Sequence, residues 1–227
     1  MRKVFTYIKE KSERLPGKNF LDLNGRPLWK WIIEELEEFD LYVNTDSEGL
    51  YKELKSYAHV TPIKRSRKHI EWEKRAKDLG SPAMDMVKEY CEKYLNVAED
   101  FAVVHVTSPF LKTATLKNAF ALFEENDCHS VHSVRKIQDF VLSEKDGVLS
   151  PENFTFNHIS RTQDLDPMYQ SLGAFFVLNS TKLDEANYQR LLPTSILYPV
   201  SAIESIEIDQ EEDFNFAKIV ARSTLGE

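Results

Sequence analysis

The sequence predicts an α/β protein with a mainly parallel, Rossmann-like sheet flanked by helices, and three observations carry this prediction. Short apolar segments alternate with longer amphipathic ones along most of the chain, which is typical of βαβ units. One apolar segment, FAVVHV at residues 101–106, has the composition of a strand buried in the middle of a sheet. The length of 227 residues, 42% of them hydrophobic, fits one globular unit. We therefore expect a single domain over residues 1–227.

The expected strands are short apolar runs bounded by polar or turn-forming residues. They are residues 3–8 (KVFTYI), 40–45 (DLYVNT), 59–63 (HVTPI), 101–106 (FAVVHV), 129–134 (HSVHSV), 173–178 (GAFFVL) and 205–208 (SIEI). The third run is short, so we expect it at an edge of the sheet.

The expected helices have apolar residues at helical spacing. They are residues 27–39, 48–58, 81–95, 113–126 and a last helix from about residue 211. The apolar face of the first helix comprises Leu28, Trp31, Ile32, Leu36 and Phe39. In the third helix, Ser81 is expected at the N-cap and Pro82 at the first helical position.

The regular alternation stops after Val134. Residues 135–172 are polar and rich in turn-forming residues, and Asp146-Gly147 predicts a short hairpin within them. We expect this segment to be a small insertion subdomain that leaves the sheet and serves as a lid or as a dimerisation element.

The composition excludes several classes of protein. The net charge of -8 and the pI near 5.4 argue against a nucleic-acid partner, although a local cationic pocket can lie on an acidic protein. Cys91 and Cys128 form no CxxC pair, so neither a zinc site nor a disulfide framework is expected. No signal peptide and no apolar run long enough for a membrane span is visible, so we expect a cytoplasmic protein without a membrane partner.

Ligands of open α/β sheets bind at the carboxyl ends of the strands, so the residues that follow each strand are the candidate site. These residues are Lys9, Lys11, Arg14, Gly17, Lys18 and Asn19 after the first strand, Asp46 after the second, Thr107, Ser108 and Pro109 after FAVVHV with His105 near its end, and Glu207 and Asp209 at SIEI. If SIEI is a strand, Glu207 and Asp209 share one of its faces.

A cationic loop opposite two carboxylates favours a nucleoside triphosphate with its metal. Mg²⁺ takes oxygen ligands and is commonly held by one or two carboxylates together with substrate phosphates. The chain has no GxxxxGK[ST] and no GxGxxG motif, which disfavours a P-loop kinase and a dinucleotide oxidoreductase.

Each of these residues also has a simpler explanation. Lysines in a loop are usually solvated, and a Glu-x-Asp pair on a strand is more often an edge or surface pair. His105 in an apolar strand could be a core histidine, and Ser81 is explained as a helix cap. The six histidines show no metal-ligand spacing, and no Ser-His-Asp or Cys-His triad can be argued.

Several segments, spread in order over nearly the whole chain, carry a family resemblance. They are RLPGKN (residues 14–19), LNGRPLWKWII, VNTDSE, DLGSPAMD, VVHVTSPFL, SRTQDLDPMYQSLGAFFVL and SIEIDQEEDFNFAK. Together they resemble the CMP-sialic acid synthetase (acylneuraminate cytidylyltransferase) family, whose matching segments are IPARxGSKRLPGKN, GKPLI, VSTD, DTASSxxD, LLQPTSPLR, RxQxLPxxYxxNGAIYI and SIDIDTxxDLxxAE. Each segment alone is weak, whereas the ordered set is fairly specific.

This resemblance implies nucleotidyl transfer, in which the anomeric hydroxyl of an acidic sugar attacks the α-phosphate of CTP and pyrophosphate leaves. Catalysis would consist mainly of positioning and charge stabilisation by Mg²⁺ and by cationic side chains. The implied catalytic residues are Lys18, Asp209 and Arg14. The implied nucleotide-binding residues are Lys9, Arg14, Lys18, Asn19 and Ser81, and the implied metal ligands are Asp209 and Glu207.

The resemblance also implies a sugar site and a second subunit. The implied substrate-binding residues are His105, Thr107, Ser108, Arg161 and Gln163. Arg161 and Gln163 lie in the insertion, which in the family packs against a second subunit and reaches its site. A homodimer is therefore expected.

The sequence departs from the family pattern mostly on the sugar side. In the phosphate loop, this sequence has Lys9 in place of the pattern's early arginine, Lys11 in place of its flexible glycine and Glu13 in place of its next lysine, and Glu207 replaces the first metal aspartate. On the sugar side, His105 replaces the sugar-contacting glutamine, Val106 the proline that follows it, Leu111 the arginine of TSPLR and Leu172 the asparagine before Gly-Ala. Nucleotide and metal features are mostly kept or replaced by similar residues, so we expect CTP with an acceptor other than ordinary sialic acid, such as another nonulosonate, a Kdo-like sugar or a small acidic alcohol. Lys11 and Glu13 leave open a homologue that binds nucleotide without turnover, as a regulatory or scaffold module. A nucleotidyltransferase that uses another base also stays open, because no residue proves a preference for cytosine.

Overall fold

The computed structural model describes residues 1–158 and 160–224, and in this part of the chain seven strands form one sheet while two more form a separate hairpin. The strands are β1 (Lys3–Ile8), β2 (Asp40–Thr45), β3 (Val60–Lys64), β4 (Asp100–Val104), β5 (Ser130–Ile137), β6 (Leu142–Lys145), β7 (Val148–Pro151), β8 (Met168–Asn179) and β9 (Ile196–Pro199). The α-helices are α1 (Leu28–Glu35), α2 (Glu48–Leu54), α3 (Arg67–Glu73), α4 (Ala76–Leu79), α5 (Ala83–Tyr94), α6 (Thr113–Glu125), α7 (Ser180–Glu185) and α8 (Glu211–Thr224), and the short 3-10 helices are η1 (Lys18–Phe20) and η2 (Thr162–Asp164).

The large sheet has the strand order β3-β2-β1-β4-β8-β5-β9. All neighbouring pairs are parallel except those of β8, which runs antiparallel to both β4 and β5. The predicted α/β class with a mainly parallel sheet is confirmed, and β3 lies at the edge as expected. The carboxyl ends of β1, β2, β3 and β4 meet along one side of the sheet, which is where this class of fold binds ligands.

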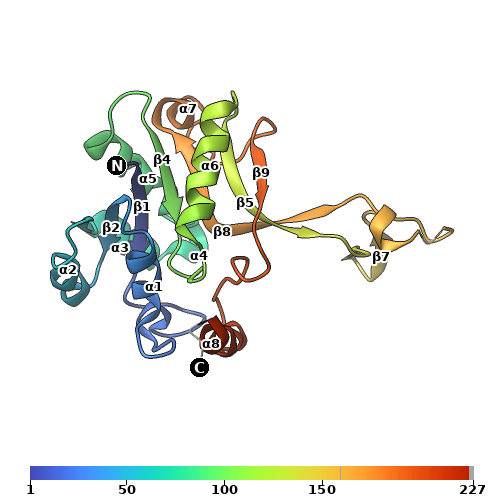
Figure 1. Cartoon of the computed structure of the whole chain (residues 1–227), viewed down its shortest axis with the longest axis horizontal. Helices are drawn as coiled ribbons and strands as arrows, with labels where there is room; N and C mark the ends of the chain where they lie inside the picture. The colour runs from blue at the N-terminus through green and yellow to red at the C-terminus, as the bar shows by residue number, and fades with distance from the viewer. Residues whose placement is uncertain (159, 225–227) are drawn as a thin grey trace.

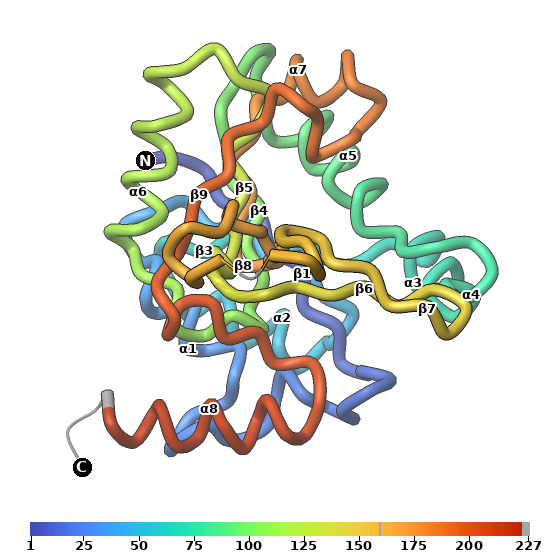
Figure 2. The backbone as a smooth tube through the Cα atoms, turned by 90° about the vertical axis from the view of Figure 1, so that its right-hand side faces the viewer, coloured from blue at the N-terminus to red at the C-terminus, as the bar shows by residue number. Residues whose placement is uncertain are grey.

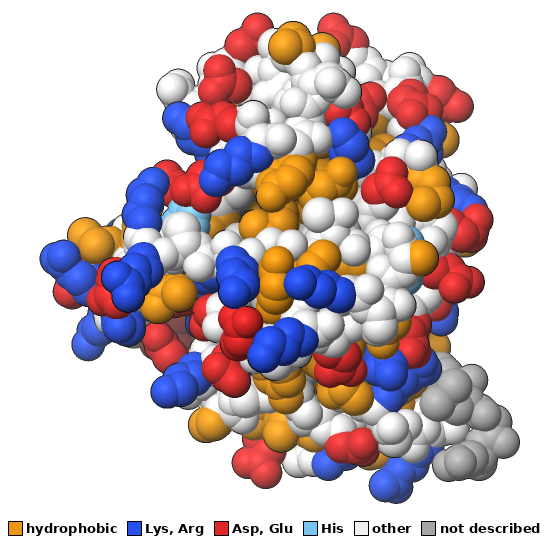
Figure 3. All heavy atoms as spheres, turned by 90° about the vertical axis from the view of Figure 1, so that its left-hand side faces the viewer, with side chains coloured by type: hydrophobic (Ala, Val, Ile, Leu, Met, Phe, Trp, Pro, Cys, Tyr) orange, Lys and Arg blue, Asp and Glu red, His pale blue; other side chains and the backbone are white. Residues whose placement is uncertain are grey.

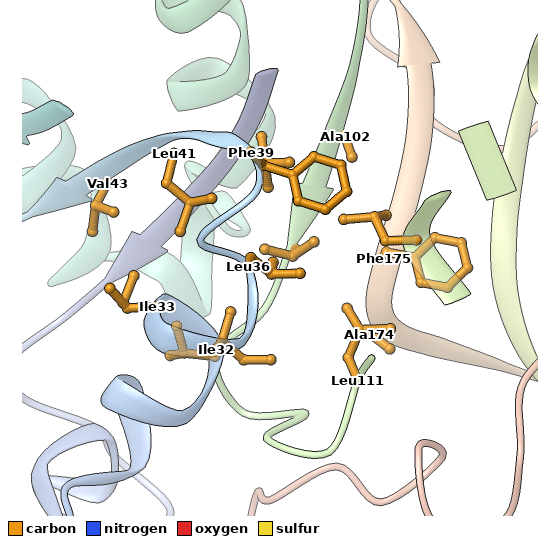
Figure 4. Close-up of a cluster of buried hydrophobic side chains, with 14 of the residues drawn as sticks. Ile32, Ile33, Leu36, Phe39, Leu41, Val43, Ala102, Leu111, Ala174 and Phe175 are labelled. Carbon is orange, nitrogen blue, oxygen red and sulfur yellow. The ribbon is translucent and has the colours of Figure 1, made fainter. Parts of the chain in front are cut away.

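Helices cover both faces of the sheet, as Figure 2 shows for α6 on one side and α5 on the other. On the α6 side, Ile32 and Ile33 of α1 and Leu36 at its C-cap pack in one apolar cluster with Leu41 and Val43 of β2 and with Ala174 and Phe175 of β8 (Figure 4). On the other side, Met86, Val87 and Tyr90 of α5 pack against Phe5, Phe101 and Val103. Burial of this apolar surface on both faces fixes the sheet, and with it the strand ends that carry the site.

The segment at residues 205–208 was predicted to be a strand, and this prediction is wrong. The segment crosses the carboxyl ends of the strands, and Ile208 donates one backbone hydrogen bond to the carbonyl of Thr107 (2.8 Å). Ile206 and Ile208 instead pack against Trp31, Phe110 and the buried side of α8. Their alternation with polar residues therefore reflects packing in this third apolar cluster and not a strand of the sheet.

Other element boundaries also differ from the prediction. The first helix ends at Glu35, because residues 36–39 form a turn in which the Phe39 amide bonds the Leu36 carbonyl (3.0 Å), although both side chains stay buried. Helix α5 begins at Ala83, so Pro82 and not Ser81 is at the N-cap, and the Ser81 hydroxyl accepts a hydrogen bond from the Ala83 amide (3.2 Å). The short elements α3, α4, α7 and β9 were not predicted.

An arm leaves the body where β5 and β8 continue beyond the rest of the sheet (Figure 1). The pairing of the two strands runs as far as Ile137 opposite Met168, so both ends of the predicted insertion belong to the sheet. The hairpin predicted at Asp146-Gly147 is present, because β6 pairs with β7 across these two residues, which both have positive φ. The arm therefore carries the segment between β5 and β8 away from the body of the fold.

Charged side chains of both signs are interspersed on the face that carries α2 (Figure 3). None of the helices in the described part of the chain is long and apolar enough to cross a membrane.

Candidate active site

The loop after β1 returns Lys18 to the carboxyl ends of the strands. Gly17 adopts a left-handed conformation (φ 65°), which glycine reaches without steric cost, and the chain then forms η1. The turn lets the Lys18 ammonium donate to the Ile208 carbonyl (2.9 Å) and to Asp209 Oδ1 (2.7 Å). Residues 190 positions apart in sequence are thus joined at one point of the site.

Asp209 is bound by a second cation of the same loop. The Arg14 guanidinium lies 2.9 Å from Asp209 Oδ2, so each carboxylate oxygen has its own cationic partner. Partial burial raises the pKa of Asp209, but the hydrogen bonds and charges of Lys18 and Arg14 outweigh burial and hold it below its usual range. Asp209 is therefore ionised at neutral pH.

A second carboxylate neutralises the other cations near the loop. Glu73 of α3 binds the Lys9 ammonium through Oε1 (3.0 Å) and the Arg65 guanidinium through Oε2 (2.7 Å). The Arg65 side chain is only 1% exposed, it donates from Nε to Asn44 Oδ1 (3.0 Å), and its Nη2 finds no partner among the described residues. Arg65 is thus a buried cation that depends on Glu73.

A cleft of about 230 Å³ lies where these residues meet. Four of the five residues predicted to bind nucleotide line it, namely Lys9, Arg14, Lys18 and Ser81. Its wall also includes Glu13, Glu73 and Pro82 at the start of α5. A second hollow of about 360 Å³ lies across the same loop, beside Lys11 and Asp46. The structure therefore brings the predicted phosphate-binding cations to one place.

Asn19, the fifth predicted nucleotide-binding residue, lies beneath the loop. Its side chain is buried, and its amide donates to the Lys9 carbonyl (2.9 Å), while its Oδ1 has no partner within the described residues. In this arrangement Asn19 fixes the path of the loop that carries Lys9, and its contact with a nucleotide stays a prediction.

The predicted sugar-side residues of the body lie next to this cleft, in differing states of exposure. His105 follows β4, is half-buried, and contacts the Tyr7 hydroxyl through Nε2 (2.9 Å). Thr107 is half-buried and its carbonyl holds Ile208 in place. Ser108 is 1% exposed and belongs to the turn after β4, so in this conformation its side chain is not open to a substrate.

The other two predicted substrate-binding residues are on the arm. Arg161 and Gln163 are exposed and lie at η2, and the Arg161 guanidinium pairs with Asp164 of the same turn (2.7 Å). Because the arm extends away from the body (Figure 1), the chain does not bring these two residues to its own cleft.

The two predicted metal ligands face different surroundings. Asp209 is partly exposed and binds Arg14 and Lys18, which line the cleft, so its carboxylate fits a hard divalent ion. Glu207 points to Gly173 and His105, accepting from the Gly173 amide (3.3 Å) and lying 4.0 Å from His105 Nδ1. His105 holds the pKa of the Glu207 carboxyl below its usual range against the opposing effect of burial. The carboxylate of Asp209 therefore fits a metal, whereas Glu207 contacts Gly173 and His105 in this structure, and a site shared by the two carboxylates stays a prediction.

Sequence reasoning missed Tyr7, Arg65, Glu73 and Gly173. Arg65 follows β3 as Lys9 follows β1, so the strand-end rule could have found it. Glu73 lies on the unpredicted helix α3, whose one buried residue, His69, binds Asp85 of α5 (2.7 Å) and holds the two helices together. Glu89 lies near this pair, so His69, Asp85 and Glu89 are close enough together to hold a metal ion, which the spacing of the histidines in the sequence did not indicate. Asp85, however, already pairs with Lys68.

The cytidylyltransferase family profile matches residues 10–180, which is more than half of the chain. The chain is 26% identical over 215 residues to an N-acylneuraminate cytidylyltransferase of Streptococcus agalactiae, covering 89% of this chain and 49% of the relative. It is 23% identical over 218 residues to a pseudaminic acid cytidylyltransferase of Campylobacter jejuni, covering 92% of this chain and 91% of the relative. The chain thus spans about half the length of the streptococcal relatives it matches.

Solved structures of nucleotidyltransferases share the fold. A CMP:2-keto-3-deoxy-manno-octonic acid synthetase complexed with CTP superposes with a TM-score of 0.68 at 12% identity, over 99% of this chain and all of that one. A 4-diphosphocytidyl-2C-methyl-D-erythritol synthase from Anaerococcus prevotii has a TM-score of 0.65 at 12% identity, over 97% of this chain and 96% of that one. At this level of identity the likeness concerns the arrangement of the elements.

Proposed function

The chain belongs to the cytidylyltransferase family, and we propose that it transfers CMP from CTP to the anomeric hydroxyl of an acidic sugar, a sialic acid-like nonulosonate or a related acceptor, with release of pyrophosphate. The observation that carries the proposal is the cleft in which Lys9, Arg14 and Lys18 converge with Asp209. The relatives act, by their names, on N-acylneuraminate and pseudaminic acid, which supports an acidic sugar as the acceptor class.

In the proposed reaction the acceptor oxygen forms a bond to the α-phosphorus of CTP. The bond between the α-phosphorus and the bridging oxygen to the β-phosphate breaks, pyrophosphate leaves with the electron pair, and the hydroxyl proton passes to solvent. Lys9, Arg14 and Lys18 would bind the phosphates and stabilise the charge that develops on the leaving group. Ser81, just before α5, would meet the nucleotide near the positive end of that helix.

We propose Mg²⁺ as the cofactor, held by Asp209 and by the phosphates of the nucleotide. Bound there, the ion would neutralise phosphate charge during the transfer. Because Asp209 pairs with Arg14 and Lys18 in the structure, its carboxylate would have to bind the ion and these side chains at the same time. That sharing couples metal binding to the position of the β1 loop.

Pyrophosphate release tests the proposal directly. The protein is incubated with CTP, Mg²⁺ and each of N-acetylneuraminate, pseudaminic acid and 2-keto-3-deoxy-manno-octonate, and UTP, GTP and ATP replace CTP in parallel. We expect release that requires both CTP and one acidic sugar, and we expect Asp209→Ala to abolish it. Glu211→Ala, an exposed carboxylate two residues further on, is the matched control and should keep activity.

A binding protein without turnover is the second candidate, and one observation favours it. The carboxylates of Glu73 and Asp209 already neutralise the cations of the cleft, and the exposed Glu13 adds a further negative charge to its wall. Calorimetric titration with CTP and Mg²⁺ separates the two candidates. Binding of CTP without release of pyrophosphate from any acceptor would favour the second.

We further propose that the chain works as a homodimer in which the arm packs on a second copy. The support is the exposed apolar surface of the arm, where Val148 is 65% exposed and Phe156 is 61% exposed. Sedimentation velocity over a range of protein concentrations tests this, and Phe156→Ser should shift the equilibrium towards the monomer.

A further inference from the structure

Three side chains from distant parts of the sequence form one connected group beside the cleft. Tyr7 lies near the end of β1, His105 directly follows β4, and Glu207 lies on the segment that crosses the strand ends. The Tyr7 hydroxyl contacts His105 Nε2 (2.9 Å), and His105 Nδ1 lies 4.0 Å from Glu207 Oε1. The other oxygen of Glu207 accepts from the Gly173 amide (3.3 Å). Both carboxylate oxygens of Glu207 are thus directed to β8 and His105.

Gly173 is what makes this arrangement possible. A Cβ at position 173 would overlap His105 Nδ1 and would lie 2.6 Å from Glu207 Oε1. Any other residue would therefore push the histidine and the glutamate apart. The glycine in β8 serves close approach of two side chains and not a turn, because its φ lies outside the left-handed region.

The group also explains departures from the family pattern. The sequence has His105 and Glu207 where the pattern has glutamine and aspartate, and it has Tyr7 where IPAR has proline. Tyr7 contacts His105, and His105 contacts Glu207, although the members of each pair are far apart in the sequence. The additional methylene of glutamate brings its carboxylate closer to His105 than an aspartate at the same backbone position could reach.

The chemistry of the contacts fixes the histidine. A carboxylate facing Nδ1 favours the proton on that nitrogen, which leaves the lone pair of Nε2 to accept from the Tyr7 hydroxyl. The ring is then held from both sides. Glu207 also forms part of the wall of a hollow of about 500 Å³ beside β5 and β8, where Arg135 is accompanied by two further carboxylates, Glu212 and Asp213.

We propose that Glu207 is a positioning residue of the acceptor site, acting through His105, and that it is not a second metal ligand. The proposal rests on the cytidylyltransferase function proposed above. The metal is then held by one carboxylate of this chain, Asp209. Tyr7 and Gly173 belong to the same positioning group.

Metal binding tests the proposal without requiring turnover. Mn²⁺ affinity in the presence of CTP is measured from the free Mn²⁺ signal in electron paramagnetic resonance. We expect Asp209→Asn to weaken Mn²⁺ binding by about tenfold or more, and Glu207→Gln to change it by less than about twofold. An equal loss in the two variants would overturn the proposal.

Glu207→Asp separates the two roles most sharply. A metal-ligand role tolerates aspartate, because the carboxylate is retained, whereas contact with His105 requires the longer side chain. We expect Glu207→Asp to behave like Glu207→Gln, raising the acceptor KM by about tenfold with the CTP KM unchanged. An acceptor KM equal to that of the unaltered protein in Glu207→Asp, with a raised one in Glu207→Gln, would contradict the positioning role.

Gly173→Ala gives an independent readout, since it disturbs His105 and Glu207 without removing either. It should raise the acceptor KM as Glu207→Gln does and leave Mn²⁺ affinity unchanged. If this variant does not fold, Glu207→Asp still decides between the two roles.

Failure of the proposed cytidylyltransferase function would give a different result. The unaltered protein would then release no pyrophosphate with any acidic sugar, while the Mn²⁺ measurements on Asp209 and Glu207 would still give their answer.

Discussion

The β1-loop cleft and the arm differ in how far their side chains are paired or buried within the chain. In the cleft, Asp209 and Glu73 bind cations drawn from the β1 loop and from the end of β3. On the arm, large apolar side chains such as Phe156 are exposed, and the polar contacts are local ones such as Arg161 with Asp164. The cations of the cleft are therefore paired within one chain, whereas the arm exposes apolar surface.

Binding in the cleft and association through the arm therefore depend on different forces. A triphosphate entering the cleft exchanges internal ion pairs for its own, so binding there depends on electrostatic competition. A partner meeting the arm covers apolar surface that is already exposed, so association there depends on the hydrophobic effect. Variants that affect one region should leave the other unchanged, and the following predictions use that separation.

The largest expected effect comes from Lys18→Met, which removes one of the two cations that join the β1 loop to Asp209. We expect kcat/KM for CTP to fall by about a hundredfold or more, because a preorganised positive charge at the phosphates is lost. Lys11→Met is the matched control, since Lys11 is in the same loop, is exposed, and lines only the second hollow in the described structure. Equal losses in both variants would mean that the loop acts only through its total charge.

A pH effect of about 3 kcal/mol is expected at the root of the arm, where His132 of β5 is buried against Phe176. Burial, with a further contribution from the positive charge of Arg190, lowers the pKa of His132 to about 4 from its usual 6.5. Because the unfolded chain then binds a proton that the folded one does not, the free energy of unfolding should fall as pH decreases from 6.5 to 4, by up to about 3 kcal/mol.

Urea unfolding at several pH values measures this contribution. His132→Asn should reduce the slope between pH 4 and 6.5, even if it lowers stability at every pH. His158→Asn, at an exposed histidine of the arm, is the control and should leave the slope as it is. An unchanged slope in His132→Asn would show that other groups carry the acid sensitivity of the fold.

Glu73→Gln should have opposite effects on stability and on nucleotide binding. Arg65 is buried and loses its counter-ion, so the free energy of unfolding should decrease by about 2 kcal/mol. Lys9 loses its internal partner as well, so CTP should bind several-fold more tightly, measured by calorimetry. Glu71→Gln, on the exposed side of the same helix, should change neither quantity. Weaker CTP binding in Glu73→Gln would mean that Glu73 positions the cations and does not compete with the triphosphate.

The sequence predicted the parts of this comparison that depend on local pattern. The βαβ alternation predicts the sheet and the side on which ligands bind, and the residues after β1 line the cleft as expected. Asp146-Gly147 predicts the hairpin of the arm because both residues tolerate positive φ. These features depend on neighbouring residues, which a sequence displays directly.

Long-range contacts could not be predicted in the same way. Glu207 and Asp209 look like a pair because they are two residues apart, yet one contacts Gly173 and His105 while the other binds the β1 loop. Their separation follows from the segment at 205–208, whose alternating pattern has the same appearance whether a strand or an apolar cluster buries the isoleucines. Glu73 was missed because its role arises only when α3 lies against the ends of β1 and β3.

The smallest expected effect concerns Arg161 of the arm. Both partners of its ion pair with Asp164 are exposed and three residues apart, so Arg161→Ala should change the free energy of unfolding by less than about 0.5 kcal/mol. Any change in acceptor KM would therefore report contact with substrate and not loss of folding. Since the arm points away from its own cleft, that contact would come from a second copy and should weaken as the protein is diluted. Asp164→Ala breaks the same ion pair but keeps the guanidinium. A raised acceptor KM in both variants would show that the acceptor depends on the shape of the η2 turn. A raised acceptor KM in Arg161→Ala alone would show that it depends on the positive charge of Arg161.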